Sequence, residues 1–156
     1  MPLIELQTVI KAPIQICFDE ARNLDLHQKS TAQTKEKAIA GKTTGYLELG
    51  ESVTWRAKHL GFYQELTSTM EELESPHYFK DVMVKGTFKK MEHIHRFKAV
   101  ENGTLMTDHF YYESPMGVLG KLADQLFLKR YLTNFIQTKN TYLKEVLEEN
   151  QHPTIT

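Results

Sequence analysis

The chain has 156 residues, of which 40% are hydrophobic and 25% are charged, and its formal net charge is −1. This size and composition fit one globular domain, and the lack of a basic surplus argues against nucleic acid as a partner. No apolar run reaches membrane-spanning length, the first residues do not resemble a signal peptide, and the single cysteine, Cys17, cannot form an internal disulfide, so we expect a cytoplasmic protein without membrane insertion.

The first 30 residues are predicted to contain one strand and two short helices. Residues 3–11 alternate imperfectly between apolar and polar side chains, which indicates a strand. Pro13 suits the first turn of a helix, and the apolar residues that follow at helical spacing extend this helix to about Arg22. Asn23 is a favourable N-cap for a second short helix that ends near Ser30.

Residues 35–113 have the pattern of an antiparallel meander. Short alternating segments are separated by turns rich in glycine, proline and asparagine. In 91–98, for example, the odd-numbered side chains would point to the covered face of the sheet and the even-numbered ones to solvent. The turn at Glu101-Asn102-Gly103 is short enough to form a hairpin.

The C-terminal part of the chain is predicted to form one long amphipathic helix. Ser114-Pro115 provides a favourable N-cap and first residue, and no proline interrupts 116–149. The helix would be on the order of 50 Å long, and its broad apolar stripe requires a sheet to pack against. We expect Lys129, Lys139 and Lys144 to lie on its solvated face. The domain is placed at 1–150, and the tail 151–156 is predicted to be disordered.

These elements predict an α+β fold, in which a strongly curved antiparallel sheet holds the long helix on its concave side. Short motifs follow one another along nearly the whole chain. They are Ile10-x-Ala12-Pro13-x-x-x-x-Phe18, Gly50-x-x-Val53-Thr54-Trp55-x-Ala57-x-His59-x-Gly61, Phe79-x-Asp81-x-Met83, Gly86-x-Phe88, His93-x-His95-x-Phe97 and Thr107-Asp108-x-x-x-Tyr112-x-x-Pro115.

With these motifs and this order of elements, the sequence resembles the START/Bet v 1-like (SRPBCC) superfamily, in particular its polyketide cyclase/dehydrase-related bacterial proteins. The resemblance implies a helix-grip fold, in which a seven-stranded sheet wraps around the C-terminal helix and encloses a cavity. It also implies a range of functions, because members bind lipids, hormones, polyketides or aromatic compounds, and some are cyclases or dehydratases.

Polar residues recur on the covered face of the predicted sheet, where they are costly unless they are paired or line a pocket. The inward residues that we predict to form a ligand-binding site are Trp55, His59, Phe79, Asp81, Met83, His93, His95, Phe97, Asp108 and Tyr112. An inward aspartate needs a partner, and the strands of 86–113 form one hairpin. We therefore predict that Asp108 lies within hydrogen-bond range of His93 or His95.

This aspartate–histidine group has two interpretations. It is either a buried network that fixes the register of the hairpin, or an acid–base pair with His93, His95 and Asp108 as candidate catalytic residues. The two histidines also lie on one face as metal ligands would, with Asp81 or Asp108 as a third ligand. A hydrogen-bonded histidine pair explains them without an ion, so we predict neither a metal nor a cofactor.

The leading hypothesis is a binding protein for an apolar small molecule, either aromatic, polyketide-like or lipid-like. The alternative is a cyclase or dehydratase that acts on a polyketide-like substrate through the histidine–aspartate pair. A third possibility is a regulator of stress responses or partner proteins, whose cavity is incidental. The sequence leaves both a monomer and a homodimer open.

Overall fold

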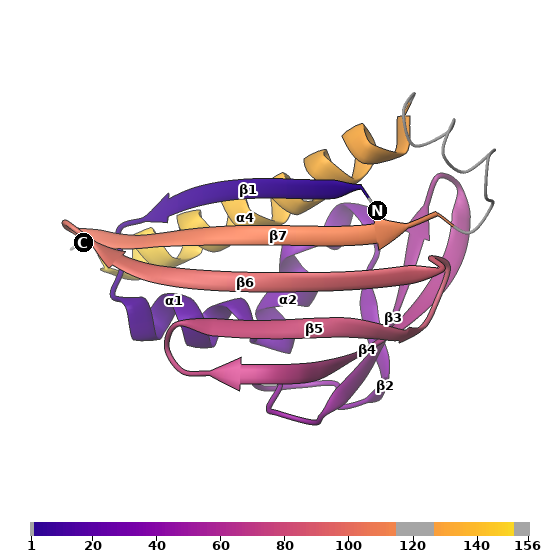
Figure 1. The fold of residues 1–156 in the computed structure, drawn as a ribbon, viewed down its shortest axis with the longest axis horizontal. Helices are drawn as coiled ribbons and strands as arrows, with labels where there is room; N and C mark the ends of the chain where they lie inside the picture. The colour runs from indigo at the N-terminus through magenta and orange to yellow at the C-terminus, as the bar shows by residue number, and fades with distance from the viewer. Residues whose placement is uncertain (1, 115–126, 152–156) are drawn as a thin grey trace, which may run out of the picture.

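The computed structural model describes residues 2–114 and 127–151 and has the predicted α+β architecture (Figure 1). One antiparallel sheet of seven strands has the order β1-β7-β6-β5-β4-β3-β2. Its strands are β1 (Leu3–Ile10), β2 (Lys37–Gly41), β3 (Ser52–His59), β4 (Phe62–Glu74), β5 (Tyr78–Lys85), β6 (Lys90–Val100) and β7 (Gly103–Glu113). The helices are α1 (Ile14–Ala21), α2 (Leu24–Ser30), a 3-10 turn η1 (Ala32–Thr34) and α4 (Lys129–Gln151).

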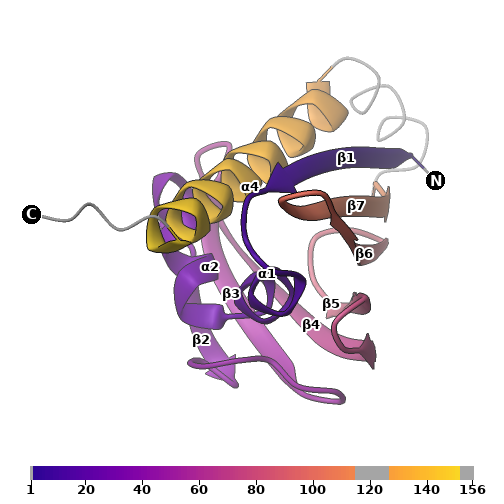
Figure 2. The same cartoon turned by 90° about the vertical axis from the view of Figure 1, so that its left-hand side faces the viewer.

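The sheet curves around α4, and α1 and α2 lie on the same concave side (Figure 2). Helix α4 packs against β1 and α2. Its 23 residues span about 35 Å. The predicted helix start at Ser114-Pro115, the segment 116–126 and the tail 152–156 include residues that lie outside the described part of the chain. None of the described helices combines the length and apolar character needed to cross a membrane.

Two asparagines act as the sequence predicts. The Asn23 side chain accepts hydrogen bonds from the backbone N–H groups of Asp25 and Leu26, which caps the first turn of α2. Asn102 has a φ of 63° in the turn between β6 and β7, a conformation that asparagine tolerates better than most residues. This tight turn fixes the pairing of β6 with β7.

The core has two parts, which occupy different stretches of the concave face. The first surrounds α1, where Phe18 packs edge-to-face against Phe79 and Phe97. The second lies under the N-terminal half of α4 and includes Tyr112 and Ile136. Both parts are built from the inward rows of the sheet, as the alternation predicts.

Candidate functional site

A cavity of about 270 Å³ lies between the sheet and the N-terminal half of α4. Apolar side chains supply most of its wall, among them Leu66, Met91 and Ile136. Three lining residues are exposed: Leu60 in the β3–β4 turn, Glu65 on β4 and Thr87 in the β5–β6 turn. The mouth of the cavity therefore lies where these two turns approach the start of α4.

The predicted site residues divide between the cavity and its surroundings. Those that line the cavity are Trp55, His59, Asp81 and His93. Phe79 and His95 do not line the cavity but line a neighbouring space of about 50 Å³. Those that line neither are Met83, Phe97, Asp108 and Tyr112. Strand alternation gives the face on which a side chain lies, but not whether that part of the face is cavity or packed core.

The four residues outside both spaces have packing or supporting positions. Phe97 belongs to the core around α1, while Met83 and the fully buried Tyr112 belong to the core under α4. Asp108 is only 1% exposed and lies behind the two histidines. None of the four lines the cavity or the neighbouring space, and Asp108 contacts the two histidines that do, so a ligand contact of these four side chains stays a prediction.

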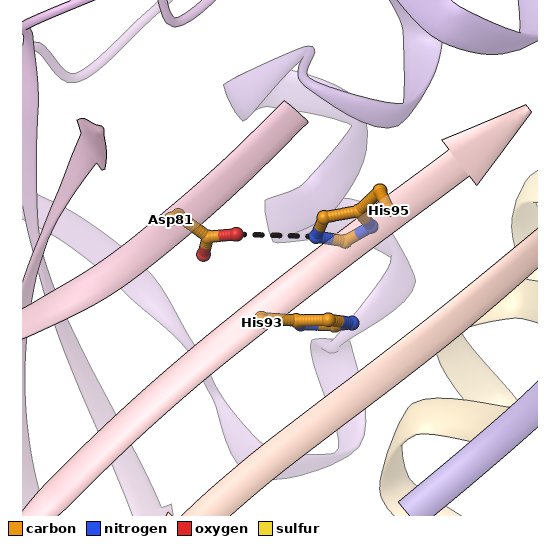
Figure 3. Close-up of side chains that lie close together, drawn as sticks. All are labelled: Asp81, His93 and His95. Carbon is orange, nitrogen blue, oxygen red and sulfur yellow. Dashed lines mark hydrogen bonds and ion pairs between the residues drawn. The ribbon is translucent and has the colours of Figure 1, made fainter. Parts of the chain in front are cut away.

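Asp108 is the centre of a buried polar network. Its Oδ1 accepts a hydrogen bond of 2.8 Å from His93 Nε2 and lies 3.1 Å from His95 Nδ1. Its Oδ2 accepts a 2.7 Å hydrogen bond from Asn140 Nδ2 on α4. On the other side, His95 Nε2 donates to Asp81 Oδ1 at 3.1 Å (Figure 3). The predicted contact between Asp108 and one of the histidines is therefore present with both.

Strand register places these groups together. His95 lies directly opposite Asp108 on β7, and His93 lies directly opposite Asp81 on β5. The two imidazole rings stack with centroids 3.8 Å apart and planes at 28° (Figure 3). His95 consequently lies between two carboxylates, whereas His93 uses one nitrogen for Asp108 and has no described hydrogen-bond partner at Nδ1.

The network separates the protonation states of the two histidines. Burial lowers the pKa of His95, but the hydrogen bonds that it donates to Asp108 and Asp81 outweigh burial and raise this pKa above its ordinary value. Burial and the adjacent His95 lower the pKa of His93 to about 4. His95 is thus the cation of the network at neutral pH, and His93 is neutral.

Both aspartates remain ionised. Burial raises the pKa of Asp108, but His93 and His95 outweigh it and hold this pKa well below its usual range. Burial likewise opposes ionisation of Asp81, but His95 lowers its pKa to about 2. Two carboxylates therefore share one imidazolium, and the network carries a net negative charge.

A second polar group, absent from the predicted site, lies on the cavity wall. Glu36 is 9% exposed, and its Oε1 lies 2.6 Å from His27 Nε2. The His27 ring packs on Trp55 with centroids 4.3 Å apart. Burial raises the pKa of Glu36, but His27 and Lys139 outweigh it and lower this pKa overall. All four residues line the cavity.

His59 connects β3 to α4 near the mouth. Its Nδ1 lies 2.7 Å from the hydroxyl of Tyr131, and its ring packs edge-to-face on Phe135. Burial lowers the pKa of His59, although Glu36 partly opposes this effect. The neutral imidazole of His59 and the hydroxyl of Tyr131 thus form a polar contact between β3 and α4 in a mainly apolar part of the cavity wall.

Sequence patterns could have identified some of the site residues that the prediction missed. Asn140 interrupts the apolar stripe of α4 at a position where helical spacing calls for a buried residue, and His27 lies one turn after the buried Leu24. Lys139 was expected on the solvated face, but it is half-buried and lines the cavity. Its stem lies beside the stripe, and a long lysine side chain can follow an apolar wall to a polar group.

Asp81, His93 and His95 together have the composition of a metal-ligand set. One nitrogen of His93, one nitrogen of His95 and one oxygen of Asp81 lie within 4.8 Å of one another. Imidazole and carboxylate groups in this number are ligands that Zn²⁺ and related ions accept.

Solved structures share this architecture at low sequence identity. TTHA0849 from Thermus thermophilus has a TM-score of 0.77 at 17% identity, covering 94% of this chain and 97% of that one. Major latex-like protein 151 from Panax ginseng has a TM-score of 0.68 at 16% identity, covering 94% and 97%. Ara h 8.0201 has a TM-score of 0.60 at 10% identity, covering 91% and 97%. The last two are Bet v 1-like proteins.

No protein-family model matches the sequence, and no curated protein matches it significantly. The similarity to solved structures therefore establishes the fold. The resemblance seen in the sequence is confirmed at this level: the chain has the Bet v 1-like helix-grip fold.

Proposed function

We propose that this helix-grip protein binds a small, mainly apolar molecule in the cavity beneath α4. The observation that carries the proposal is the cavity of about 270 Å³, whose apolar wall includes a few inward polar groups. Such a combination is typical of small-molecule sites, where apolar contact supplies affinity and the polar groups orient the ligand. The Bet v 1-like fold supports the same conclusion.

The volume favours a compact ligand over a long chain. An apolar cavity of about 150 Å³ in another protein accommodates benzene. In proportion, about 270 Å³ corresponds to a ligand of roughly eleven non-hydrogen atoms. A fused bicyclic aromatic has this size, whereas an extended polyketide or acyl chain is larger. Among the predicted ligand classes, we therefore propose the aromatic one.

The charges at the inner end favour a neutral polar group on this ligand. The carboxylates of Glu36 and Asp81 and the ammonium of Lys139 all line the cavity. Among the described lining residues, two carboxylates offset this ammonium, so a ligand carboxylate would meet no surplus positive charge. A hydroxyl can instead donate a hydrogen bond to either protein carboxylate.

Binding of β-naphthol, a bicyclic phenol, tests this proposal. We expect saturable binding by the wild type, followed by calorimetry or by the fluorescence of Trp55, the only tryptophan. Naphthalene carboxylate should bind more weakly. Ala57 lines the cavity, so Ala57→Leu should fill part of it and weaken β-naphthol binding at least about tenfold.

Ala99→Leu is the matched control, because Ala99 is an exposed residue near the end of β6 and does not line the cavity. It should bind β-naphthol as the wild type does. Absence of saturable β-naphthol binding, or equal affinity in Ala57→Leu and wild type, would overturn the proposal.

A second candidate function is cyclisation or dehydration of a polyketide-like substrate, and one observation favours it. His93 lines the cavity, is neutral, and has no described hydrogen-bond partner at Nδ1. A neutral imidazole held by a carboxylate can act as a general base. Incubation with a synthetic poly-β-ketone should then give cyclised product with the wild type and none with His93→Gln, while β-naphthol binding persists. No turnover by the wild type would exclude this function.

A further inference from the structure

We propose that Asp81, His93 and His95 bind a divalent transition-metal ion of the Zn²⁺ type at the inner end of the cavity. One ligand atom from each residue lies within 4.8 Å of the other two. Figure 3 shows the carboxylate of Asp81 beside the edge of the His95 ring, with His93 stacked below it. The ligand set would be an Asp81 oxygen, His95 Nε2 and His93 Nδ1.

The spacing is close to that of a tetrahedral site. With bonds of about 2.0 Å, two ligands of a tetrahedral ion are about 3.3 Å apart. His95 Nε2 and Asp81 Oδ1 are already 3.1 Å apart. One nitrogen of His93 lies within 4.8 Å of a ligand atom of Asp81 and of His95, so an approach of about 1.5 Å at most brings three such atoms to this spacing.

The residues behind the rings supply the support that metal-bound histidines need. A ligating histidine usually donates its other ring N–H to a carboxylate, which fixes the orientation of the ring. Asp108 Oδ1 lies 2.8 Å from His93 Nε2 and 3.1 Å from His95 Nδ1, so one carboxylate holds both rings by the nitrogens that the ion would not use. Asn140 in turn holds the other oxygen of Asp108.

The site would face the cavity and not the protein interior. Asp81 and His93 both line the cavity, so a fourth coordination position would be open to a small molecule or water. Asp81 and Asp108 offset the charge of a divalent ion, whereas the nearby ammonium of Lys139 opposes it.

Binding requires a local rearrangement that can be measured. The two rings stack at 28°, so their in-plane lone pairs run side by side and do not converge on one point. The ion would displace the Nε2 proton of His95, and the ring of His93 would turn toward Asp81. The ring resonances of these two histidines should therefore change on metal binding.

Metal titration of the full chain, stripped with a chelator, tests the proposal. We expect one equivalent of Zn²⁺ by calorimetry, and visible ligand-field bands of Co²⁺ at the same stoichiometry. Asp81→Asn should abolish stoichiometric uptake, and Asp108→Asn should weaken it roughly 10–100-fold. His109→Gln, on the other face of β7, is the control and should bind as the wild type does.

Histidine NMR spectra of the wild type keep the proposal testable if a variant fails to fold. Addition of Zn²⁺ should shift the ring resonances of His93 and His95 and leave those of His27 and His59 in place. No stoichiometric uptake, uptake unaffected by Asp81→Asn, or shifts confined to other histidines would each overturn it. Naphthol binding by the metal-free protein is a separate measurement, so either proposal can fail alone.

Discussion

Asn140 Nδ2 donates a 2.7 Å hydrogen bond to Asp108 Oδ2, and this contact joins α4 to β7. The two residues are 4% and 1% exposed. Asp108 Oδ1 already accepts a hydrogen bond from His93, so Asn140 supplies the donor for the second oxygen. Because a buried carboxylate is costly without donors, this pair fixes the position of the helix over the strand that carries the network.

Asn140→Leu should destabilise the protein by about 1–3 kcal/mol, because it leaves one buried oxygen of Asp108 without a donor. Urea unfolding at neutral pH measures the free energy of unfolding directly. The control is Asn134→Leu, the same substitution on the exposed side of α4, which should change stability by less than about 0.5 kcal/mol. Equal effects of the two substitutions would show that the Asn140 contact contributes no stability.

His95→Gln should destabilise the protein by about 3–5 kcal/mol, because it removes the cation that Asp81 and Asp108 share. Asp81→Asn should relieve part of this cost, since one of the two carboxylates is then neutral. In a double-mutant cycle with a chelator present, the double variant should be more stable than additivity predicts by about 0.5–3 kcal/mol. Strict additivity would contradict the shared-cation description.

The fold and the centre of the network were predictable because they depend on local patterns. Alternation fixes the inward face of each strand, and the short turn at Asn102 sets the register that places His95 opposite Asp108. A one-residue slip of this pairing would turn either row outward. The contact between the hairpin's aspartate and its histidines therefore follows from the sequence between 86 and 113.

The rest of the site depends on tertiary packing that no local pattern encodes. Asn140 reaches Asp108 from a helix that the sequence places over the sheet without fixing its rotation or depth. Glu36 contacts His27 across the turn η1, a segment that has neither the helical nor the strand spacing of apolar residues. Which inward residues face a cavity, as Trp55 does, and which pack in the core, as Phe97 does, depends on the curvature of the sheet.

The Glu36–His27 pair should make stability fall at acidic pH. The folded-state pKa of Glu36 lies below its ordinary value of 4.5, so its contribution is present above that value and is lost as the pH falls through the folded pKa. His27, Lys139 and His59 are the charged or titratable groups that favour its ionised form.

Urea unfolding of the wild type and Glu36→Gln between about pH 6 and pH 3 isolates this contribution. The wild type should be the more stable protein at the upper end, and the difference should shrink below pH 4.5. A difference that grows as the pH falls would show that Glu36 is destabilised in its ionised form. In that case burial, and not the contact with His27, would dominate its energetics.

Tyr131→Phe should speed ligand exchange more than it changes stability. The substitution removes the hydroxyl that lies 2.7 Å from His59 Nδ1, and this bond joins β3 to α4 beside the mouth of the cavity. Loss of one hydrogen bond of about 0.5–1.5 kcal/mol corresponds to roughly a two- to tenfold faster release of β-naphthol. Stopped-flow fluorescence of Trp55 measures this rate. The control is Tyr142→Phe, which lies further along α4 and away from the cavity lining and should leave the release rate unchanged. Equal release rates in the wild type and Tyr131→Phe would show that the contact between His59 and Tyr131 does not control release of the ligand.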